Sequence, residues 1–501
     1  MEFSTNKEPC LNNHRKNVAQ KNTLNKGKRT YKQLLTKVFP VNQTQNQYPT
    51  NTRRLVQRFR YYIYKLVKGF GVEKVSLVLL TMLFITLPWN LGKHIQTEQS
   101  YYNQKLISYL MPTIYVQDVL VAAFVILQGL ACLRKIRFSN VPFVKPFLIL
   151  TILVFFALFF SERSYPALYL FSRIFLYFIF FVFAFSFFQQ VLVRKSFVYI
   201  LLANSLLLCV LGFLQFQKQA SVFTNYLFFG EQPYTYFTSG VARESYFGAT
   251  KIPPYGTFQH PNVLAGFVSV AALFVAFLLS KAVARVLKLF YSLTFAALFI
   301  LMVLAKSYVA IFSLLFVLVG FLVIRRVITT RTRAALLLVT FTVVLLSGFL
   351  FSLYTPYLSF YKNIRAESPS FSRRATLLDA SYKMIAEKPL FGWGLNSFTY
   401  SSEPYFQTKT DAFFIQPTHS VYVLAGVETG LLSVLVFIFI LFGIVYRLAK
   451  LDTFLPLPII HFSFLFSFDH YFYTYGPAFL LFILTLLFCL AYTKKESAYD
   501  Y

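Results

Sequence analysis

Residues 260–280 read HPNVLAGFVSVAALFVAFLLS, a run in which no side chain after His260 is charged. About 20 consecutive apolar residues are enough for a helix to cross the hydrocarbon core of a bilayer. Similar runs recur along the chain, whose 501 residues are 57% hydrophobic and only 13% charged. An ordinary soluble domain carries about 25% charged residues. The sequence therefore predicts an all-α, polytopic integral membrane protein and excludes a soluble enzyme or a disordered chain.

The apolar runs divide the chain into about twelve expected transmembrane helices. Four parts follow from them: a tail over 1–70, N-terminal helices over 71–217, a core over 218–450, and C-terminal helices with a short tail over 451–501. The expected spans are 74–91, 113–133, 144–161, 166–188, 196–217, 260–280, 286–305, 307–325, 333–353, 421–446, 453–469 and 474–492.

The chain has a formal net charge of +30, and its distribution matters more than its sum. Residues 1–70 hold 15 Lys and Arg against Glu2 and Glu8, with almost no apolar periodicity. We expect this tail to be a mostly disordered cytoplasmic arm whose last part lies on anionic headgroups. Although such an excess suits nucleic acid in a soluble protein, we expect no nucleic-acid partner here. The four cysteines show no spacing typical of disulfides or structural zinc.

The connections between spans indicate the orientation of the chain. Short cytoplasmic loops of membrane proteins are enriched in Lys and Arg. With the tail inside, every expected inner loop is basic, so both termini should be cytoplasmic. The inner-loop cations are Arg134, Lys135, Arg137, Arg194, Lys195, Lys281, Arg285, Lys288, Arg325, Arg326, Arg331, Arg333, Arg447, Lys450, Lys494 and Lys495.

Two connections are long, 218–259 and 354–420, and both face outward in this topology. Loops of such length are usually functional. Within the second, apolar residues from Phe371 to Tyr382 recur at helical spacing, which predicts an amphipathic helix on the outer membrane surface.

Ionisable groups gather at the outer ends of the expected spans. A charge at the hydrocarbon boundary is costly, so its presence suggests a function. Arg173, inside the fourth span, needs a polar partner or an aqueous cavity for the same reason. The outer groups are Asp118, His260, Lys306, His419, Asp469 and His470, with Arg243, Lys251, Arg373 and Arg374 in the two long connections.

Three motifs resemble the signature of the O-antigen ligase/O-antigen polymerase superfamily. The first is GTFQHPNVLAG at 256–266; the second is Arg373-Arg374 followed by KMIAEKPLFGWGLNSF at 383–398; the third is THSVY at 418–422 with ETGLL at 428–432. They occur in the family's order. The chain departs from the family's pattern at Pro253, Pro254 and Tyr255, where many members have an Arg, at Lys306-Ser307, and at Ser420, where Asn is usual.

The resemblance implies a bacterial inner-membrane glycosyltransferase that needs no metal and no cofactor. It would move a glycan from a polyprenyl diphosphate to a hydroxyl of a glycan, lipid or protein outside the membrane. His is the usual general base near neutral pH, and Arg binds phosphate oxygens bidentately. We therefore predict His419 as the base and Arg374 and Arg373 as catalytic cations. The predicted substrate-binding residues are Arg243, Lys251, His260, Asn262, Lys306, Asn396, Asp469 and His470.

Some alternatives remain open at this point. Asp469 and His470 could orient or replace the base, or form only a structural hydrogen-bond pair, and Glu428 reads better as a buried structural group than as a reactant. A transporter or flippase of lipid-linked sugars is the main rival function. Such proteins place polar groups near the midplane and often contain repeats, whereas this chain shows no repeat and concentrates its polar groups at one face. A non-catalytic scaffold whose tail recruits partners is a weaker rival.

Overall fold

The computed structural model describes residues 71–132, 140–326, 329–358, 369–406 and 416–492, and the statements below concern these residues. From Val72 onward they belong to one compact unit. The basic tail at 1–70 lies outside the described residues, as do the cations at 134, 135, 137, 494 and 495, so those predictions stay untested.

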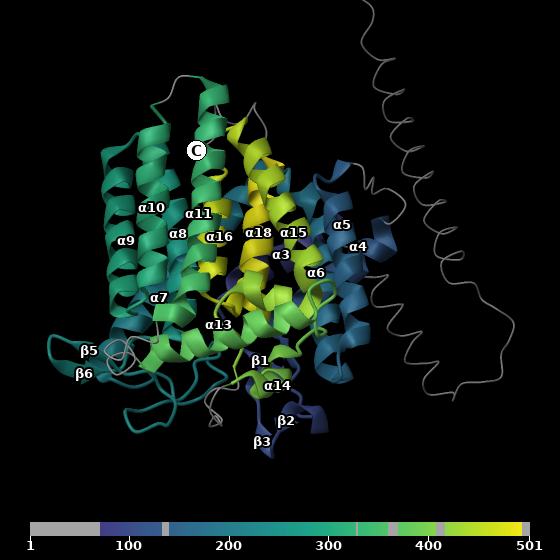
Figure 1. The fold of residues 1–501 in the computed structure, drawn as a ribbon. Helices are drawn as coiled ribbons and strands as arrows, with labels where there is room; N and C mark the ends of the chain where they lie inside the picture. The colour runs from purple at the N-terminus through teal and green to yellow at the C-terminus, as the bar shows by residue number, and fades with distance from the viewer. Residues whose placement is uncertain (1–70, 133–139, 327–328, 359–368, 407–415, 493–501) are drawn as a thin grey trace, which may run out of the picture. The chain divides into compact units, whose positions relative to one another are not determined.

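The unit consists mainly of helices, with three short hairpin-like strand pairs near one end of them (Figure 1). Strand β1 (Gly92–His94) pairs antiparallel with β4 (Thr113–Tyr115), β2 (Tyr101–Tyr102) with β3 (Lys105–Leu106), and β5 (Glu244–Tyr246) with β6 (Ala249–Lys251). The helices are α3 (Val72–Thr86), α4 (Val116–Cys132), α5 (Val144–Ala157), α6 (Ser164–Phe188), α7 (Val191–Lys218), α8 (Pro261–Lys281), α9 (Arg285–Leu304), α10 (Tyr308–Ile324), α11 (Thr330–Leu358), α13 (Pro369–Glu387), α14 (Phe398–Ser401), α15 (Val421–Ala449), α16 (Leu457–Phe468), α17 (Tyr471–Thr474) and α18 (Gly476–Ala491).

Each of the twelve expected spans coincides with one of these helices. Within the described residues, six are long and apolar enough to cross a membrane: α6, α7, α8, α9, α11 and α15. The apolar helices α4, α5, α10, α16 and α18 are shorter. The prediction of a polytopic helical membrane protein is confirmed, while the count of twelve transmembrane helices stays a prediction.

Helix α8 is buried along most of its length. His461 of α16 joins it to α10, because its Nε2 lies 2.8 Å from Ser269 Oγ and its Nδ1 lies 2.7 Å from Ser313 Oγ. Near the start of α8, the Tyr471 hydroxyl occupies the space that a Cβ on Gly266 would fill. The glycine therefore allows α8 to approach the segment between α16 and α18.

Helix α15 is broken at Gly430, whose φ of 81° and ψ of 162° are not helical. A neighbouring strap, residues 389–395, supplies the hydrogen bonds that the break removes. Trp393 N donates to Val427 O at 2.8 Å, Gly394 N to Glu428 O at 3.0 Å, and Leu431 N to Pro389 O at 2.8 Å. A broken helix at membrane depth is tolerated only where protein satisfies its backbone groups, and here the strap does so.

The carboxylate of Glu428 completes this junction. Its Oε2 accepts a hydrogen bond from the Tyr473 hydroxyl at 2.9 Å, and its Oε1 lies 3.4 Å from the backbone N of Phe398. The motifs at 389–398 and 428–432 thus meet in space and hold one another. The interpretation of Glu428 as a buried structural group agrees with these contacts.

The elements outside the long helices collect at one end of them. Helix α13 runs crosswise to α11 and α15 at this end (Figure 1). It was expected as an amphipathic helix, and its Ala375, Leu378 and Met384 are buried while Lys383 is exposed. A third connection, residues 87–115, also folds here as β1–β4. No periodicity in the sequence marks these strands, so their fold was not predicted.

We predict that Gly430→Ala destabilises the protein strongly. An added Cβ would lie 2.0 Å from Leu390 O, and the positive φ disfavours any side chain. The cost should be about 2 kcal/mol or more, seen as a lower midpoint of thermal denaturation in detergent.

The matched control is Gly320→Ala in α10, where a Cβ would meet nothing within 4 Å. Alanine is favoured over glycine inside a helix by about 0.5–1 kcal/mol, so this variant should be at least as stable as the wild type. Equal midpoints for the two variants would contradict the proposed role of the strap.

Candidate active site

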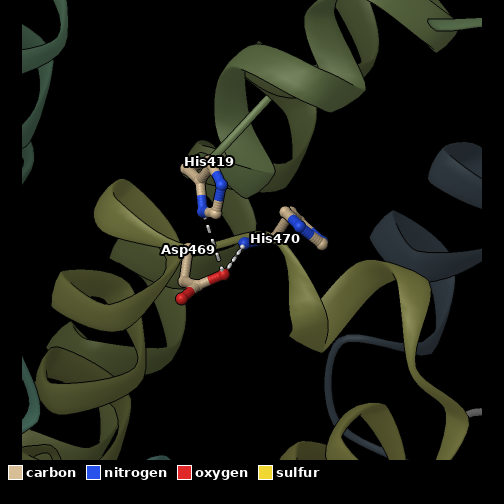
Figure 2. Close-up of side chains that lie close together, drawn as sticks. All are labelled: His419, Asp469 and His470. Carbon is tan, nitrogen blue, oxygen red and sulfur yellow. Dashed lines mark hydrogen bonds and ion pairs between the residues drawn. The ribbon is translucent and has the colours of Figure 1, made fainter. Parts of the chain in front are cut away.

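Three separate stretches of chain meet at the end of the unit that carries α13. They are the start of α8, the residues just before α15, and the link between α16 and α17. Figure 2 shows His419, Asp469 and His470 at this meeting point. Each stands beside a helix end, where backbone groups lack partners within the helix.

Asp469 connects the three stretches. Its Oδ1 accepts the backbone N–H of His470 at 2.8 Å and lies 3.6 Å from His419 Nδ1 (Figure 2). Its Oδ2 lies 3.4 Å from Asn262 Nδ2 on α8. The predicted residues Asn262, His419, Asp469 and His470 are therefore brought together.

His419 is positioned by the N-terminus of α15. Ser420 caps this helix, since its Oγ accepts the backbone N–H of Val423 at 3.3 Å. The His419 side chain is 18% exposed and that of Asp469 is 12% exposed, so both are shielded but within reach of a substrate. Nδ1 of His419 faces the carboxylate at 3.6 Å. A proton on Nδ1 would leave Nε2 as the proton acceptor. The separation of 3.6 Å is long for a hydrogen bond, as is common for catalytic pairs without substrate.

The charges around this pair set its protonation. Burial, followed by the positive charge of Arg374, lowers the pKa of His419 below 6.5, and Asp469 opposes this only in part. Burial alone would raise the pKa of Asp469, but His419, His470 and Arg374 together hold it below its usual value. At neutral pH the site therefore contains a neutral imidazole beside a carboxylate, which is the state required of a general base.

His470 has a different environment from His419. Its Nδ1 lies 2.9 Å from Thr474 Oγ1, and its ring stands edge-on to Tyr109 at 5.5 Å between centroids. Burial lowers the pKa of His470 to about 3. His470 is thus a neutral residue that lines the site, and its backbone N–H donates a hydrogen bond to Asp469.

Arg373 and Arg374 bring positive charge to the site from the early turns of α13. Both side chains are partly buried, and both charges act on His419. The charge of Arg374 also reaches Asp469 and His470. The structure therefore places the predicted base and both predicted catalytic cations in one region, and this arrangement suits an anionic group such as a diphosphate.

His260 and Asn396 use their polar atoms mainly within the protein. Nδ1 of His260 accepts the backbone N–H of Asn262 at 3.1 Å and thereby caps α8, while its ring is exposed next to the site. Asn396, with a φ of 55°, donates from Nδ2 to Tyr109 O at 3.1 Å. This contact positions Tyr109 against His470. Tyr109 was not among the predicted site residues, because no motif surrounds it in the sequence.

The other predicted cations lie around the β5–β6 hairpin. Arg243 stacks on Tyr236 with 5.2 Å to the ring centroid, Lys251 on Phe216 with 5.2 Å, and Lys306 on Tyr246 with 4.9 Å. The charges that act most strongly on His419 come from Arg374, Asp469 and Arg373 instead. A role for the hairpin cations in substrate binding stays a prediction.

Arg173 has the partner that the sequence required. Its Nη2 lies 2.9 Å from Asp118 Oδ2, and Tyr177 donates to Asp118 Oδ1 at 2.6 Å. Asp118 also accepts the backbone N–H of Tyr115, which orders the start of α4. A buried pair satisfied in this way acts as a structural element, because removing one partner would leave the other charge uncompensated.

His419, Asp469 and His470 also present ligand atoms within 4.8 Å of one another, a spacing that a metal ion could use. Two features favour an anion instead. Arg373 and Arg374 already bring positive charge to His419, and Nδ1 of His470 is engaged by Thr474. The metal-free site implied by the family resemblance stays a prediction, and this electrostatic argument favours it.

These features define a multi-pass membrane protein with a His–Asp pair and two arginines at one end of its helices. Residues 293–438 match the family model described as Wzy_C, O-antigen ligase, so this stretch of the chain is similar to the O-antigen ligase family. The match confirms the resemblance seen in the motifs. It includes Arg373, Arg374 and His419, whereas Asp469 and the motif at 256–266 lie outside it. No curated protein and no solved structure matches the chain.

We expect the protein to hold no stoichiometric transition metal at this site. Elemental analysis of protein purified without chelator should give substoichiometric zinc, manganese and iron, and EDTA should leave the thermal midpoint unchanged. One equivalent of metal that is lost in His419→Ala would contradict this expectation.

Proposed function

We propose that the protein transfers a glycan from a polyprenyl diphosphate to an acceptor hydroxyl on the extracytoplasmic side of the bacterial inner membrane. The family match over residues 293–438 supports the type of activity, a glycosyltransferase of the O-antigen ligase/polymerase kind. The proposal adds the donor, the acceptor, the side of the membrane and the residues. The observation that carries it is the His419–Asp469 pair with Arg374 and Arg373 beside it.

In the proposed step, Nε2 of His419 takes the proton of the acceptor hydroxyl. The oxygen then attacks the anomeric carbon of the donor sugar, and the bond from that carbon to the diphosphate breaks. The diphosphate leaves with the electron pair. Asp469 orients the imidazole and stabilises the imidazolium that forms, as a carboxylate does in a catalytic triad.

Arg374 and Arg373 would act on the leaving group. Negative charge grows on the diphosphate as the bond breaks, and fixed cations in a shielded site stabilise such charge most effectively. Because these arginines also lower the pKa of His419, a bound diphosphate that neutralises them would make the imidazole a stronger base. The donor would thereby assist the activation of the acceptor.

An apolar cavity beside the site supports a lipid-linked donor. It has a volume of about 140 Å³ and lies among α5, α6, α15, α16, α17 and α18. Val421 and Phe472 line it, and they follow His419 and His470 closely in the chain. A cavity of about this size holds a benzene-sized molecule, so it would accept a short part of a polyprenyl chain.

The distribution of basic residues supports the proposed orientation. Helices α8 and α15 both begin at the site, so Lys281, Arg447 and Lys450 lie at the opposite end. Arg333 belongs to that opposite end too, since its Nη1 lies 3.1 Å from Thr453 Oγ1. Cytoplasmic ends are rich in Lys and Arg, which would place the site outside.

A transporter of lipid-linked sugars remains the second candidate, and the break in α15 favours it. Broken helices form the substrate sites of many transporters. Here, however, the strap occupies the break and satisfies its backbone groups, while His419 and Asp469 lie at helix ends. These observations favour transfer over transport.

The decisive experiment compares His419→Ala with His94→Ala in proteoliposomes that contain the lipid-linked donor and either an oligosaccharide or a lipid acceptor. His94 lies on β1 and contacts Thr113, so it serves as a matched histidine control. His419→Ala should lower the rate of transfer by about 10²–10⁴-fold, as expected on loss of a general base. His94→Ala should keep the wild-type rate.

Normal product formation by His419→Ala would overturn the assignment of the base. Movement of labelled donor across the membrane without acceptor, unaffected by His419→Ala, would favour the transporter instead. Elongation of the oligosaccharide would indicate a polymerase, and attachment of the glycan to the lipid acceptor would indicate a ligase.

The pH dependence of transfer follows from the same charges. Since the base acts in its neutral form and its pKa is lowered, the rate should fall only as the pH drops below 6.5. Arg374→Gln removes a charge that lowers this pKa, so its acidic limb should move to higher pH. Asp469→Asn should move the limb to lower pH, because Asp469 raises the pKa of His419. Limbs at the wild-type position in both variants would contradict the assignment of His419.

A further inference from the structure

Two β-hairpins of the protein have two-residue turns with opposite chemistry. The β2–β3 turn is Asn103-Gln104, and the β5–β6 turn is Phe247-Gly248. All four turn residues have positive φ, between 47° and 86°. Hairpin turns of this kind favour Asn, Asp and Gly, so Asn103 fits its position. Phe247 is an unfavourable choice there, and its side chain is fully exposed.

The β5–β6 hairpin is fixed to the ends of two long helices. The Tyr246 hydroxyl donates to Leu304 O at the end of α9, and the Tyr246 ring packs on Phe216 of α7 with 5.0 Å between centroids. Lys306 covers the same tyrosine ring. The position of Phe247 relative to α9 is therefore defined by these contacts, through its neighbour Tyr246.

The helices next to this hairpin present an apolar surface outward. Exposed apolar residues occur along α9 and α10. The β5–β6 hairpin lies beside one end of these helices (Figure 1). In a membrane-spanning unit such a surface faces lipid. On α9 and α10, the exposed apolar residues closest in sequence to Leu304, which the hairpin contacts, are Ile300, Val303, Tyr308 and Phe312. The hairpin thus lies where the lipid-facing surface ends.

The charges around the hairpin match an anionic surface. Arg243, Lys251 and Lys306 surround it, against the single carboxylate of Glu244, which lies opposite Lys251 in the strand register. Lysine and arginine beside tyrosine are typical of the membrane–water interface, where the cations meet phosphate headgroups.

We propose that the β5–β6 hairpin is a membrane-interface anchor: Phe247 inserts among the acyl chains at the level of the headgroups, and the surrounding cations bind anionic phospholipid. The anchor would fix the connection 218–259, and with it the start of α8, at the height of the membrane surface. The turn of the β2–β3 hairpin is polar, so in contrast to Phe247 it should stay in water. This proposal does not depend on the reaction that the protein catalyses.

The test compares two single tryptophan substitutions in the full chain, reconstituted in vesicles of phosphatidylcholine and phosphatidylglycerol. Phe247→Trp reports on the proposed anchor. Lys105→Trp, on the exposed strand β3, is the matched control. Trp89 and Trp393 contribute the same background to both variants, and the wild-type spectrum is subtracted. Far-UV circular dichroism checks that both variants are folded.

Lipids brominated near the headgroup end of their acyl chains should quench the added emission of Phe247→Trp at least twofold. They should leave the added emission of Lys105→Trp unchanged, and that of Phe247→Trp should lie at shorter wavelength. Equal quenching of the two variants would overturn the proposal. Blue-shifted emission of Phe247→Trp that brominated lipid does not quench would also overturn it, because protein rather than lipid would then cover the turn.

Discussion

The carboxylate of Asp469 is the point on which the arrangement of the site depends. Its Oδ1 accepts the backbone N–H of the neighbouring His470 and lies 3.6 Å from His419 Nδ1, and its Oδ2 lies 3.4 Å from Asn262 Nδ2. These contacts tie together residues that are more than 200 positions apart in the chain. A buried carboxylate needs such partners to remain charged. The carboxylate therefore stays charged only while these helix ends keep their positions around it.

A second constraint concerns backbone rather than charge. The glycine-rich motifs that resemble the family signature owe part of their composition to close contacts. Gly430 lets the strap approach the break in α15, and Gly266 lets Tyr471 approach α8. The polar members of the same motifs, Arg374 and His419, carry the proposed chemistry. The motifs therefore contain both glycines that allow close packing of segments and polar residues with proposed roles in the reaction.

The sequence predicted much of this protein, for reasons that can be traced to particular residues. The helices were predictable because uncharged runs such as 261–280 have few other stable states in a bilayer. The proximity of His419 and Arg374 was predictable, because both belong to the motifs and both were expected on the same side of the membrane. The contact of Asp469 with Asn262 was not, because it depends on how α8 and α16 pack. Tyr109 and the β1–β4 connection were missed, since no periodicity or motif marks them, and the hydrogen bonds between the strap and α15 join segments that carry no pairing signal.

The strap has a consequence for how the protein matures. Residues 389–395 leave the ribosome before α15 does, yet the carbonyl groups of Val427 and Glu428 that they bond belong to α15. In the proposed topology, the strap must cross the membrane first and wait there until the next hydrophobic segment is inserted. Only then can the strap and α15 form the hydrogen bonds that join them. In this topology the region around His419, the proposed general base, is completed only after α15 has been inserted into the membrane.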